Sequence, residues 1–250
     1  MMSNERVDQA AGIVMCTVER ARALGVPEEN WVFPYACSEA SAPMVAERPD
    51  LATSPMLRAC GDALWKATGL GPDDVAHVDL YSCFPSAVQQ QALEFGLGLE
   101  RQLTVTGGMR FSGGPWNNYA MQGLAGMVPV LRNDPGSIAL CTANGGYISK
   151  QAAIVYSTTP PPQPFHSVGP FDGFPVRKVD MKPTGEATLE SYTVIHGRGG
   201  EAEKGIVTCL MPDGRRALGT VTDPVLLKAM ETEDPIGQSA TFTEGVAVEL

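Results

Sequence analysis

Two short segments carry the residues whose types and spacing could do chemistry. Residues 81–84 read Tyr-Ser-Cys-Phe, and residues 140–146 read Leu-Cys-Thr-Ala-Asn-Gly-Gly. Cys83 opens an expected helix, and a helix N-terminus lowers the pKa of a nearby thiol, which favours the nucleophilic thiolate. Cys141 lies in an apolar strand, where packing is the competing interpretation. Asn144 precedes a glycine pair, so its side chain could hold a carbonyl oxygen or a water, or simply tolerate a left-handed backbone.

A glycine-rich stretch at residues 104–122 lies between these two segments. Its glycine pairs at 107–108 and 113–114 are followed by Pro115, which suits the first position of a helix because its missing N–H would be unpaired there. Glycines let the backbone approach a ligand closely, and N–H groups at a helix start favour an anion or a developing oxyanion. The stretch therefore predicts either a binding turn or a tight strand-to-helix connection without chemistry.

Alternating strands and helices are expected to position these segments. Strands are predicted at 7–16, 31–35, 76–80, 138–142 and 152–156, and helices at 17–24, 54–68, 83–96 and 115–131. This order is typical of an α/β protein in which helices cover a mixed, parallel-rich sheet with an antiparallel partner at the end. Ligands bind beyond the carboxyl ends of strands in such sheets, so residues 81–84, 107–114 and 144–146 could converge on one site.

A second domain is predicted beyond the proline-rich segment at residues 158–164, which is a stiff and extended linker. Short β segments separated by glycine-containing hairpin turns follow it, then one small helix and a last strand. The expected ranges are 188–195, 205–211 and 216–221 for the β segments, 224–233 for the helix and 246–250 for the last strand. Residues 165–250 therefore predict a small OB-like β-barrel. Because it is acidic and lacks an aromatic stacking platform, a structural or docking role is expected.

Composition excludes several classes of partner. The 250 residues carry a net charge of −10 with no basic stretch, which argues against nucleic acid and anionic membranes as primary partners. No apolar run approaches the ~20 residues of a membrane helix, and no signal pattern opens the chain. The six cysteines lack C-x-x-C spacing and the three histidines lie far apart, so no metal site is predicted. We expect a reduced, cytoplasmic protein without a tightly bound cofactor.

The chain resembles the thiolase superfamily over about residues 5–157. Residues 7–24 resemble the Asn-Asp-Gly-Ala-Ala strand and helix that finish the first half of a thiolase. Residues 81–84 fall at the Asn-Glu-Ala-Phe motif, which is His-Asp-Cys-Phe in the sterol-carrier-protein type. Residues 113–115 fall at Gly-His-Pro, and 140–146 at the Cys-x-Gly-Gly loop. The subgroup most similar to this chain is the actinobacterial thiolase-like proteins, usually labelled acetyl-CoA acetyltransferase, which carry an extra C-terminal β domain.

This resemblance implies the C-terminal half of an acyl-CoA protein. Residues 1–24 would be the last strand and helix of an N-terminal half, 25–157 the C-terminal thiolase domain, and 165–250 the extra OB-like domain. A coenzyme A thioester would be the substrate or ligand. An oligomer or a partner protein would supply the missing half, which in thiolases carries the nucleophilic cysteine.

The same resemblance assigns site residues by position. The expected catalytic residues are Cys141, Cys83 and Ser82, and the expected substrate-binding residues are Tyr81, Phe84, Gly114, Asn144 and Gly145. The second-cysteine position could be Cys141, or Thr142 if the glycines set the register. Gly114 replaces the Gly-His-Pro histidine, and residues 81–82 replace the Asn-Glu pair. An acetyl-CoA acetyltransferase-like portion that is inactive alone is therefore expected. The alternative is a non-catalytic scaffold subunit that docks a partner enzyme of lipid or sterol metabolism.

Overall fold

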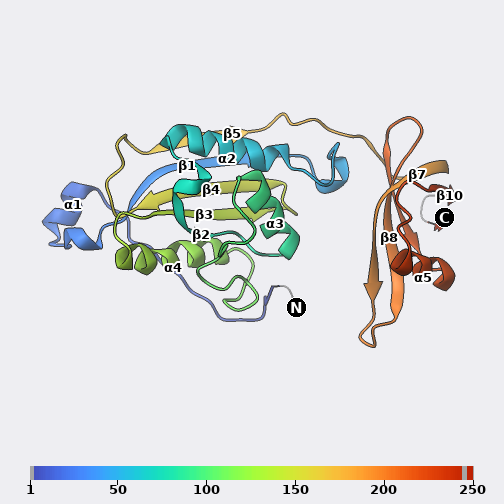
Figure 1. The fold of residues 1–250 in the computed structure, drawn as a ribbon, viewed down its shortest axis with the longest axis horizontal. Coiled ribbons are helices and arrows are strands. Elements are labelled where there is room, and N and C mark those ends of the chain that lie inside the picture. The colour runs from blue at the N-terminus through green and yellow to red at the C-terminus, as the bar shows by residue number, and fades with distance from the viewer. Residues whose placement is uncertain (1–2, 244–246, 250) are drawn as a thin grey trace. The chain divides into compact units, whose positions relative to one another are not determined.

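The computed structural model describes residues 3–243 and 247–249 and divides into two compact units (Figure 1). The first unit contains the residues up to Val45 and Asp50–Phe174. The second contains Ala46–Pro49 and the residues from Pro175 onward. Residues 46–49, here called the excursion, thus belong to the second unit, although the residues on either side of them in the sequence belong to the first.

A mixed sheet covered by helices on both faces forms the first unit, as predicted from the sequence. Its strands are β1 (Phe33–Ser41), β2 (Val75–Asp79), β3 (Ile138–Gly145), β4 (Lys150–Ser157) and β5 (His166–Phe171), in the order β2-β3-β4-β1-β5. The β2–β3 and β1–β5 pairs are parallel, and β3–β4 and β4–β1 are antiparallel. Because β2 and β3 are parallel neighbours, their carboxyl ends lie at the same edge.

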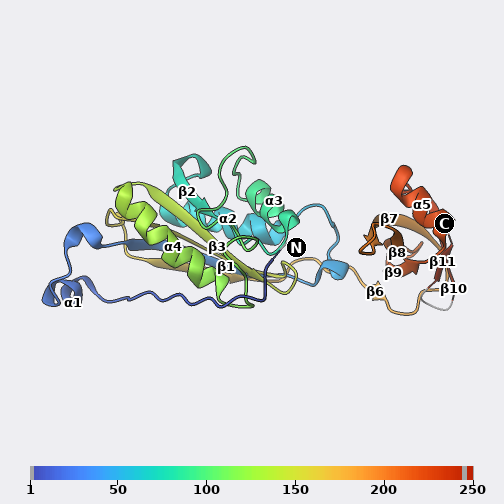
Figure 2. The ribbon, with the colours of Figure 1, turned by 90° about the horizontal axis from the view of Figure 1, so that it is seen from below.

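The helices of this unit are α1 (Val18–Ala23), α2 (Pro55–Thr68), α3 (Pro85–Glu94) and α4 (Tyr119–Asn133), with short 3₁₀ turns at Glu28–Asn30, Val45–Glu47 and Pro72–Asp74. Figure 2 shows α2 and α3 on one side of the sheet and α4 on the other. Two separate apolar clusters fill these layers, one under α2 and α3 and one under α4.

Helix α2 forms where local sequence signals predicted it. Ser54 caps its start by accepting a hydrogen bond from the Leu57 N–H at 3.4 Å, and Pro55 occupies the first position. Gly69 ends the helix in a left-handed conformation with φ of 70°. These capping interactions involve only the helix and the residues next to it in the sequence, so they need no tertiary contact.

Two predicted elements are wrong in the structure. Residues 7–16 form no strand, and Val14 in their midst is 95% exposed. Helix α4 begins at Tyr119 rather than at Pro115. Trp116 has a φ of 53°, which a right-handed helix does not permit, so the chain turns once more before the helix starts.

Residues 166–171 were assigned to the second domain with no strand predicted there, but they form β5 in the first sheet. It pairs in parallel with β1, with Ala36 opposite His166 and Cys37 opposite Ser167. The proline-rich segment at 158–164 therefore runs within the first unit and carries the chain from β4 to the far side of β1.

The second unit is a single mixed sheet that curls into a half-barrel, with one helix against it. Its elements are β6 (Val179–Asp180), β7 (Gly185–His196), β8 (Ala202–Leu210), β9 (Arg216–Val221), α5 (Pro224–Thr232), β10 (Ser239–Thr243) and β11 (Ala247–Glu249). The end strand β11 pairs with β10 and also with β9, which curls the sheet back on itself. Part of the strand expected at 246–250 lies outside the described residues, and membership of the OB class stays a prediction.

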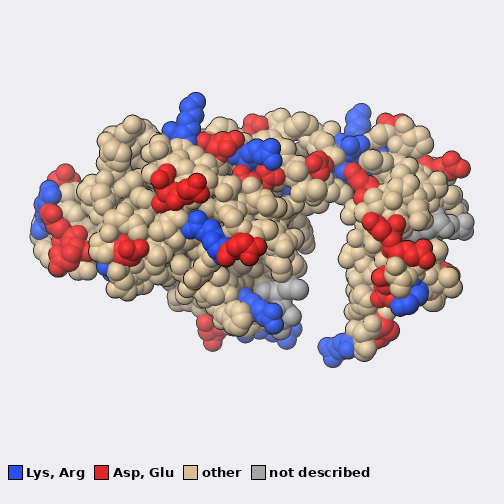
Figure 3. Space-filling model, in the orientation of Figure 1, with Lys and Arg blue, Asp and Glu red and all other residues tan. Residues whose placement is uncertain are grey.

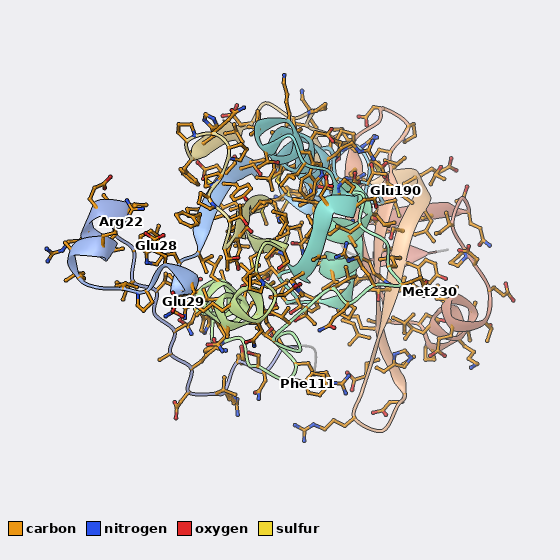
Figure 4. The ribbon with its side chains drawn as sticks, turned by 60° about the vertical axis from the view of Figure 1, so that its left-hand side comes forward. Arg22, Glu28, Glu29, Phe111, Glu190 and Met230 are labelled. Carbon is orange, nitrogen blue, oxygen red and sulfur yellow. The ribbon has the colours of Figure 1, made fainter. Side chains whose placement is uncertain are left out.

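A buried arginine explains why the excursion at 46–49 belongs to this second unit. The Arg216 side chain is fully buried and donates to both carboxylate oxygens of Glu190, at 2.6 and 2.8 Å (Figure 4 labels Glu190). Its Nη1 also donates to the backbone carbonyls of Ala46, at 2.8 Å, and of Arg48. The excursion thus supplies acceptors that a guanidinium would otherwise lack inside the protein.

Candidate functional site

The carboxyl ends of β2 and β3 bring together the two segments that the sequence singled out. The Tyr81 N–H donates to the Thr142 hydroxyl at 2.9 Å. The Cys83 thiol lies 3.7 Å from the Asn144 side-chain oxygen. Residues 81–84 therefore meet the carboxyl end of β3, as expected for residues 144–146, through the contact between Cys83 and Asn144.

Residues 107–118, here called the glycine loop, reach the same place. The Met109 N–H donates to the Ser82 hydroxyl at 3.0 Å. Gly108 approaches Ser82 so closely that an added Cβ would lie 2.9 Å from its hydroxyl oxygen, so a side chain there would displace Ser82. The loop thus packs against Ser82 through backbone atoms, which explains why residue 108 is a glycine.

Cys141 and Thr142 are neighbours on β3. Their side chains therefore point to opposite faces of the sheet. The Cys141 sulfur lies 2.8 Å from the Tyr156 hydroxyl, in the apolar cluster under α4. Its burial raises the thiol pKa, so it holds no appreciable thiolate at neutral pH. Thr142 points to the opposite face, toward α3 and Tyr81. The structure thus brings Thr142 to the other candidate residues and leaves Cys141 away from them.

A buried glutamine on α3, to which the sequence reasoning gave no role, ties these strand ends together. Gln91 accepts a hydrogen bond from the Thr142 hydroxyl at 2.6 Å and donates to the Tyr81 carbonyl at 2.8 Å. Its oxygen also accepts from the Gln151 amide at 3.2 Å. The signal in the sequence was a polar residue midway between Ala87 and Phe95 on the apolar face of the helix.

Two buried polar atoms at this site have no hydrogen-bond partner within the described protein. They are the Asn144 side-chain nitrogen, a donor, and the Gln151 side-chain oxygen, an acceptor. Asn144 and Gln151 are directly opposite one another in the β3–β4 ladder, where Cβ atoms are typically ~4.5–5.5 Å apart. Because buried polar groups in native proteins are almost always paired, this adjacent donor and acceptor indicate a ligand group or a water.

Asp79, which the sequence reasoning also missed, holds the start of the glycine-rich stretch. Its carboxylate is 2% exposed and accepts from the N–H groups of Val105 and Thr106, at 3.0 and 3.1 Å. The hydroxyls of Thr104, Thr106 and Tyr119 donate to it as well. Burial, together with this carboxylate, raises the pKa of Tyr119 to about 12, so its hydroxyl stays a donor.

Cys83 has a thiol that is less acidic than the sequence predicted. Burial raises its pKa, although hydrogen bonds with the Phe84 backbone and the Asn144 side chain oppose that change. The expected lowering by the start of α3 is therefore wrong, because desolvation of the thiolate outweighs the helix end. Its side-chain partner, Asn144, is a neutral amide rather than a base, so this partner does not accept the thiol proton.

Native Cys83 should react with iodoacetamide at least about tenfold more slowly than the exposed Cys16 at pH 7.5, since burial and a raised pKa both deplete its thiolate. The rate at Cys83 should still be rising above pH ~8.5, the pKa of an ordinary thiol. Peptide mass spectrometry after timed alkylation measures both rates, and the urea-unfolded chain provides the control in which they converge. A Cys83 rate that levels off below pH 8 would contradict the assignment.

The remaining candidates are Gly114, Phe84 and Gly145. The Gly114 N–H donates to the Asn4 carbonyl at 2.8 Å, so this donor is already used within the chain. Phe84 is 52% exposed where α3 begins, and Gly145 pairs with Lys150 at the end of the β3–β4 ladder. Phe111 stands at the outer part of the glycine loop and is 80% exposed (Figure 4).

Charged residues of both signs share the surface, and the described residues hold no metal-binding cluster. Figure 3 shows basic and acidic residues interspersed over one face of the molecule. Among residues 3–243 and 247–249, no cluster of three or more His, Cys, Asp or Glu side chains could hold a metal ion. Within the same residues, no helix has the length and apolar character needed to cross a membrane.

Comparisons with known proteins find similarity to thiolase-like proteins. A family model described as the thiolase-like protein type 1 additional C-terminal domain matches residues 169–244. The crystal structure of a monomeric SCP2-thiolase like protein type 1 from Mycobacterium smegmatis is 37% identical with a TM-score of 0.80. The match covers 91% of this chain and 52% of that protein, so this chain spans about half of its relative.

Two structures of human mitochondrial 3-ketoacyl-CoA thiolase also match, one of them in complex with CoA. Their identities are 18% and 17%, their TM-scores are 0.45, and each match covers 57% of this chain and 34% of the human protein. No curated protein sequence matches this chain.

Proposed function

The chain belongs to the thiolase superfamily as a thiolase-like protein, and we propose that it supplies one half of an acyl-CoA binding site. The observation that carries this proposal is the unpaired Asn144 amide nitrogen beside Cys83. A thioester carbonyl oxygen would supply the acceptor that this N–H donor lacks. The opposite Gln151 oxygen would accept from an amide N–H, and the pantetheine arm of coenzyme A carries two such groups.

Cations on the two loops at this site also favour a coenzyme A ligand. Arg110 lies in the glycine loop, and Lys150 opens β4 opposite Gly145. Phosphate groups of the ligand would pair with such side chains, which an acidic protein otherwise offers sparingly. A coenzyme A thioester therefore suits these cations better than a free acid, which has no phosphate groups.

We propose further that the chain binds this ligand without turning it over. A thiolase nucleophile needs a thiolate, and the pKa of the Cys83 thiol is raised rather than lowered. Gly114 stands where the resemblance would put a histidine, and its N–H already donates to Asn4. The missing nucleophile would come from the other half of the site.

The partner that brings this second half would dock at residues 12–16. These residues are extended and exposed, with Val14 at 95% and Met15 at 79%. An apolar extended segment without a neighbour suits addition to the edge of another sheet. The relative from M. smegmatis is about twice as long and is described as monomeric.

Isothermal titration with coenzyme A and acetyl-CoA tests the proposal. We expect binding to the full chain, no measurable thioester cleavage, and an affinity about 5–10-fold weaker in Asn144→Ala, as for one lost hydrogen bond. Asn133→Ala, at the exposed end of α4, is the matched control and should bind like the wild type. Absence of binding at millimolar ligand, or cleavage at ordinary enzyme rates of about 1–1,000 per second, would refute it.

A scaffold subunit is the second candidate, and the second unit favours it. That unit matches the family of additional C-terminal domains and has its own core around β7, β8 and α5. If the chain captures a thiolase or hydratase partner but binds neither coenzyme A nor acetyl-CoA, docking alone is its function.

A further inference from the structure

Residues 4–9, here called the strap, run along the glycine loop with a bend at Arg6 and Val7. The Asn4 N–H donates to the Met109 carbonyl at 3.1 Å, and the Asn4 carbonyl accepts from the Gly114 N–H at 2.8 Å. One strap residue thus bonds to both halves of the loop. The strap lies more than one hundred residues from the loop in sequence.

Gln9 fastens the other end of the strap. Its amide nitrogen donates to the carbonyls of Ser112, at 2.7 Å, and Gly113, at 3.2 Å. Its oxygen accepts from the Asn118 amide at 2.9 Å. The Val7 side chain lies directly against the position that a Cβ on Gly113 would occupy, so this glycine permits the close approach.

Hydrogen bonds rather than continuous packing hold this end of the strap. An open pocket of about 560 Å³ lies between strap residues and the loop, lined by Val7, Asp8, Gln9, Ala10, Pro115 and Asn118. Loss of the Gln9 amide donors would therefore leave few contacts to replace them.

The strap reaches the proposed ligand site through one residue. Met109 is held by its carbonyl to Asn4 and by its N–H to the Ser82 hydroxyl. Gly107, Gly108 and Gly113 all have positive φ values, of 83°, 73° and 85°. Such glycines have many alternative conformations, so a loop that contains them needs outside contacts to keep one shape.

We propose that Gln9 is a positioning residue and that the strap holds the glycine loop against Ser82 in the conformation that binds the acyl-CoA ligand. This inference rests on the function proposed above. Gln9 does not touch the ligand; it acts through Ser112 and Gly113 on the loop. Release of the strap would free Met109 and weaken ligand binding without unfolding the sheet.

The test is Gln9→Glu in the full chain, which keeps the shape of the side chain but replaces the amide nitrogen, with both of its N–H donors, by a carboxylate oxygen that faces the Ser112 and Gly113 carbonyls. Gln102→Glu is the matched control, since this exposed glutamine donates once, to the Thr104 carbonyl, outside the loop. Hydrogen exchange of residues 107–114, the dissociation constant for coenzyme A and the thermal midpoint are measured for both variants and the wild type.

We expect Gln9→Glu to speed exchange at Met109 and Gly114 and to weaken coenzyme A binding by about 5–10-fold, because the loop would spend less time in the conformation that binds, with little change in the thermal midpoint. Gln102→Glu should change neither exchange nor affinity. A merely structural role for Gln9 would move the thermal midpoint and leave the affinity of the folded chain alone.

Two results would overturn the inference and leave the proposed function standing. One is unchanged loop exchange in Gln9→Glu. The other is faster exchange with the wild-type affinity for coenzyme A. Failure of the wild type itself to bind coenzyme A would instead overturn the proposed function, and the positioning role with it.

Discussion

The variant Arg216→Met should lose about 3–5 kcal/mol of folding free energy in the second unit, the usual cost of breaking a buried ion pair by removing one partner. The substitution leaves the Glu190 carboxylate without its guanidinium and removes a donor from the carbonyls of Ala46 and Arg48. Residues 46–48 should then exchange their amide hydrogens as an unfolded segment does.

Hydrogen exchange under increasing urea, followed on peptides from 46–49 and 185–221, measures this loss. The three tryptophans lie at positions 31, 65 and 116, so fluorescence reports the first unit and should change little. Arg215→Met is the neighbouring control: that side chain is exposed and pairs with Asp213 and Asp180 at the surface. Equal losses of folding free energy in the two variants would show that the buried ion pair contributes no more than the surface pairs.

A double substitution separates the cost of an unpaired charge from the value of the pair. In Arg216→Met with Glu190→Gln, the orphaned carboxylate is gone, so part of the lost stability should return. If the double variant is instead as unstable as the sum of the single variants, the two side chains act independently.

Asp79→Asn should destabilise the first unit by about 2–4 kcal/mol, because hydrogen bonds to a charged group are each worth ~1.5–3 kcal/mol. The carboxylate accepts from two backbone N–H groups and three hydroxyls, and an amide would turn one of its acceptors into a donor. The start of the glycine-rich stretch, residues 104–106, would lose its anchor.

Tryptophan fluorescence during urea unfolding measures this change. Tyr119→Phe removes one donor only and should cost less than Asp79→Asn, and Asp62→Asn on the exposed side of α2 should cost little. An Asp79→Asn midpoint equal to that of Asp62→Asn would contradict the role given to this carboxylate.

Local signals in the sequence determined the elements that depend on few neighbours. Ser54, Pro55 and Gly69 set both ends of α2, because capping is completed within one helical turn. Alternating residues and glycine turns predicted β7, β8 and β9. The expected strand ends also predicted that residues 81–84 and 144–146 could form one site, and Cys83 and Asn144 do lie together.

Only the tertiary structure decided what needs a partner from a distant part of the chain. Residues 7–16 have the composition of a strand, but a strand requires the edge of another one, and these residues have none beside them. The choice between Cys141 and Thr142 depended on which sheet face α3 and α4 cover, since a shift of one residue reverses the face. The raised pKa of Cys83, the carboxylate of Asp79 and the contacts of Gln9 arise from burial and from groups far away in sequence, which short-range patterns do not encode.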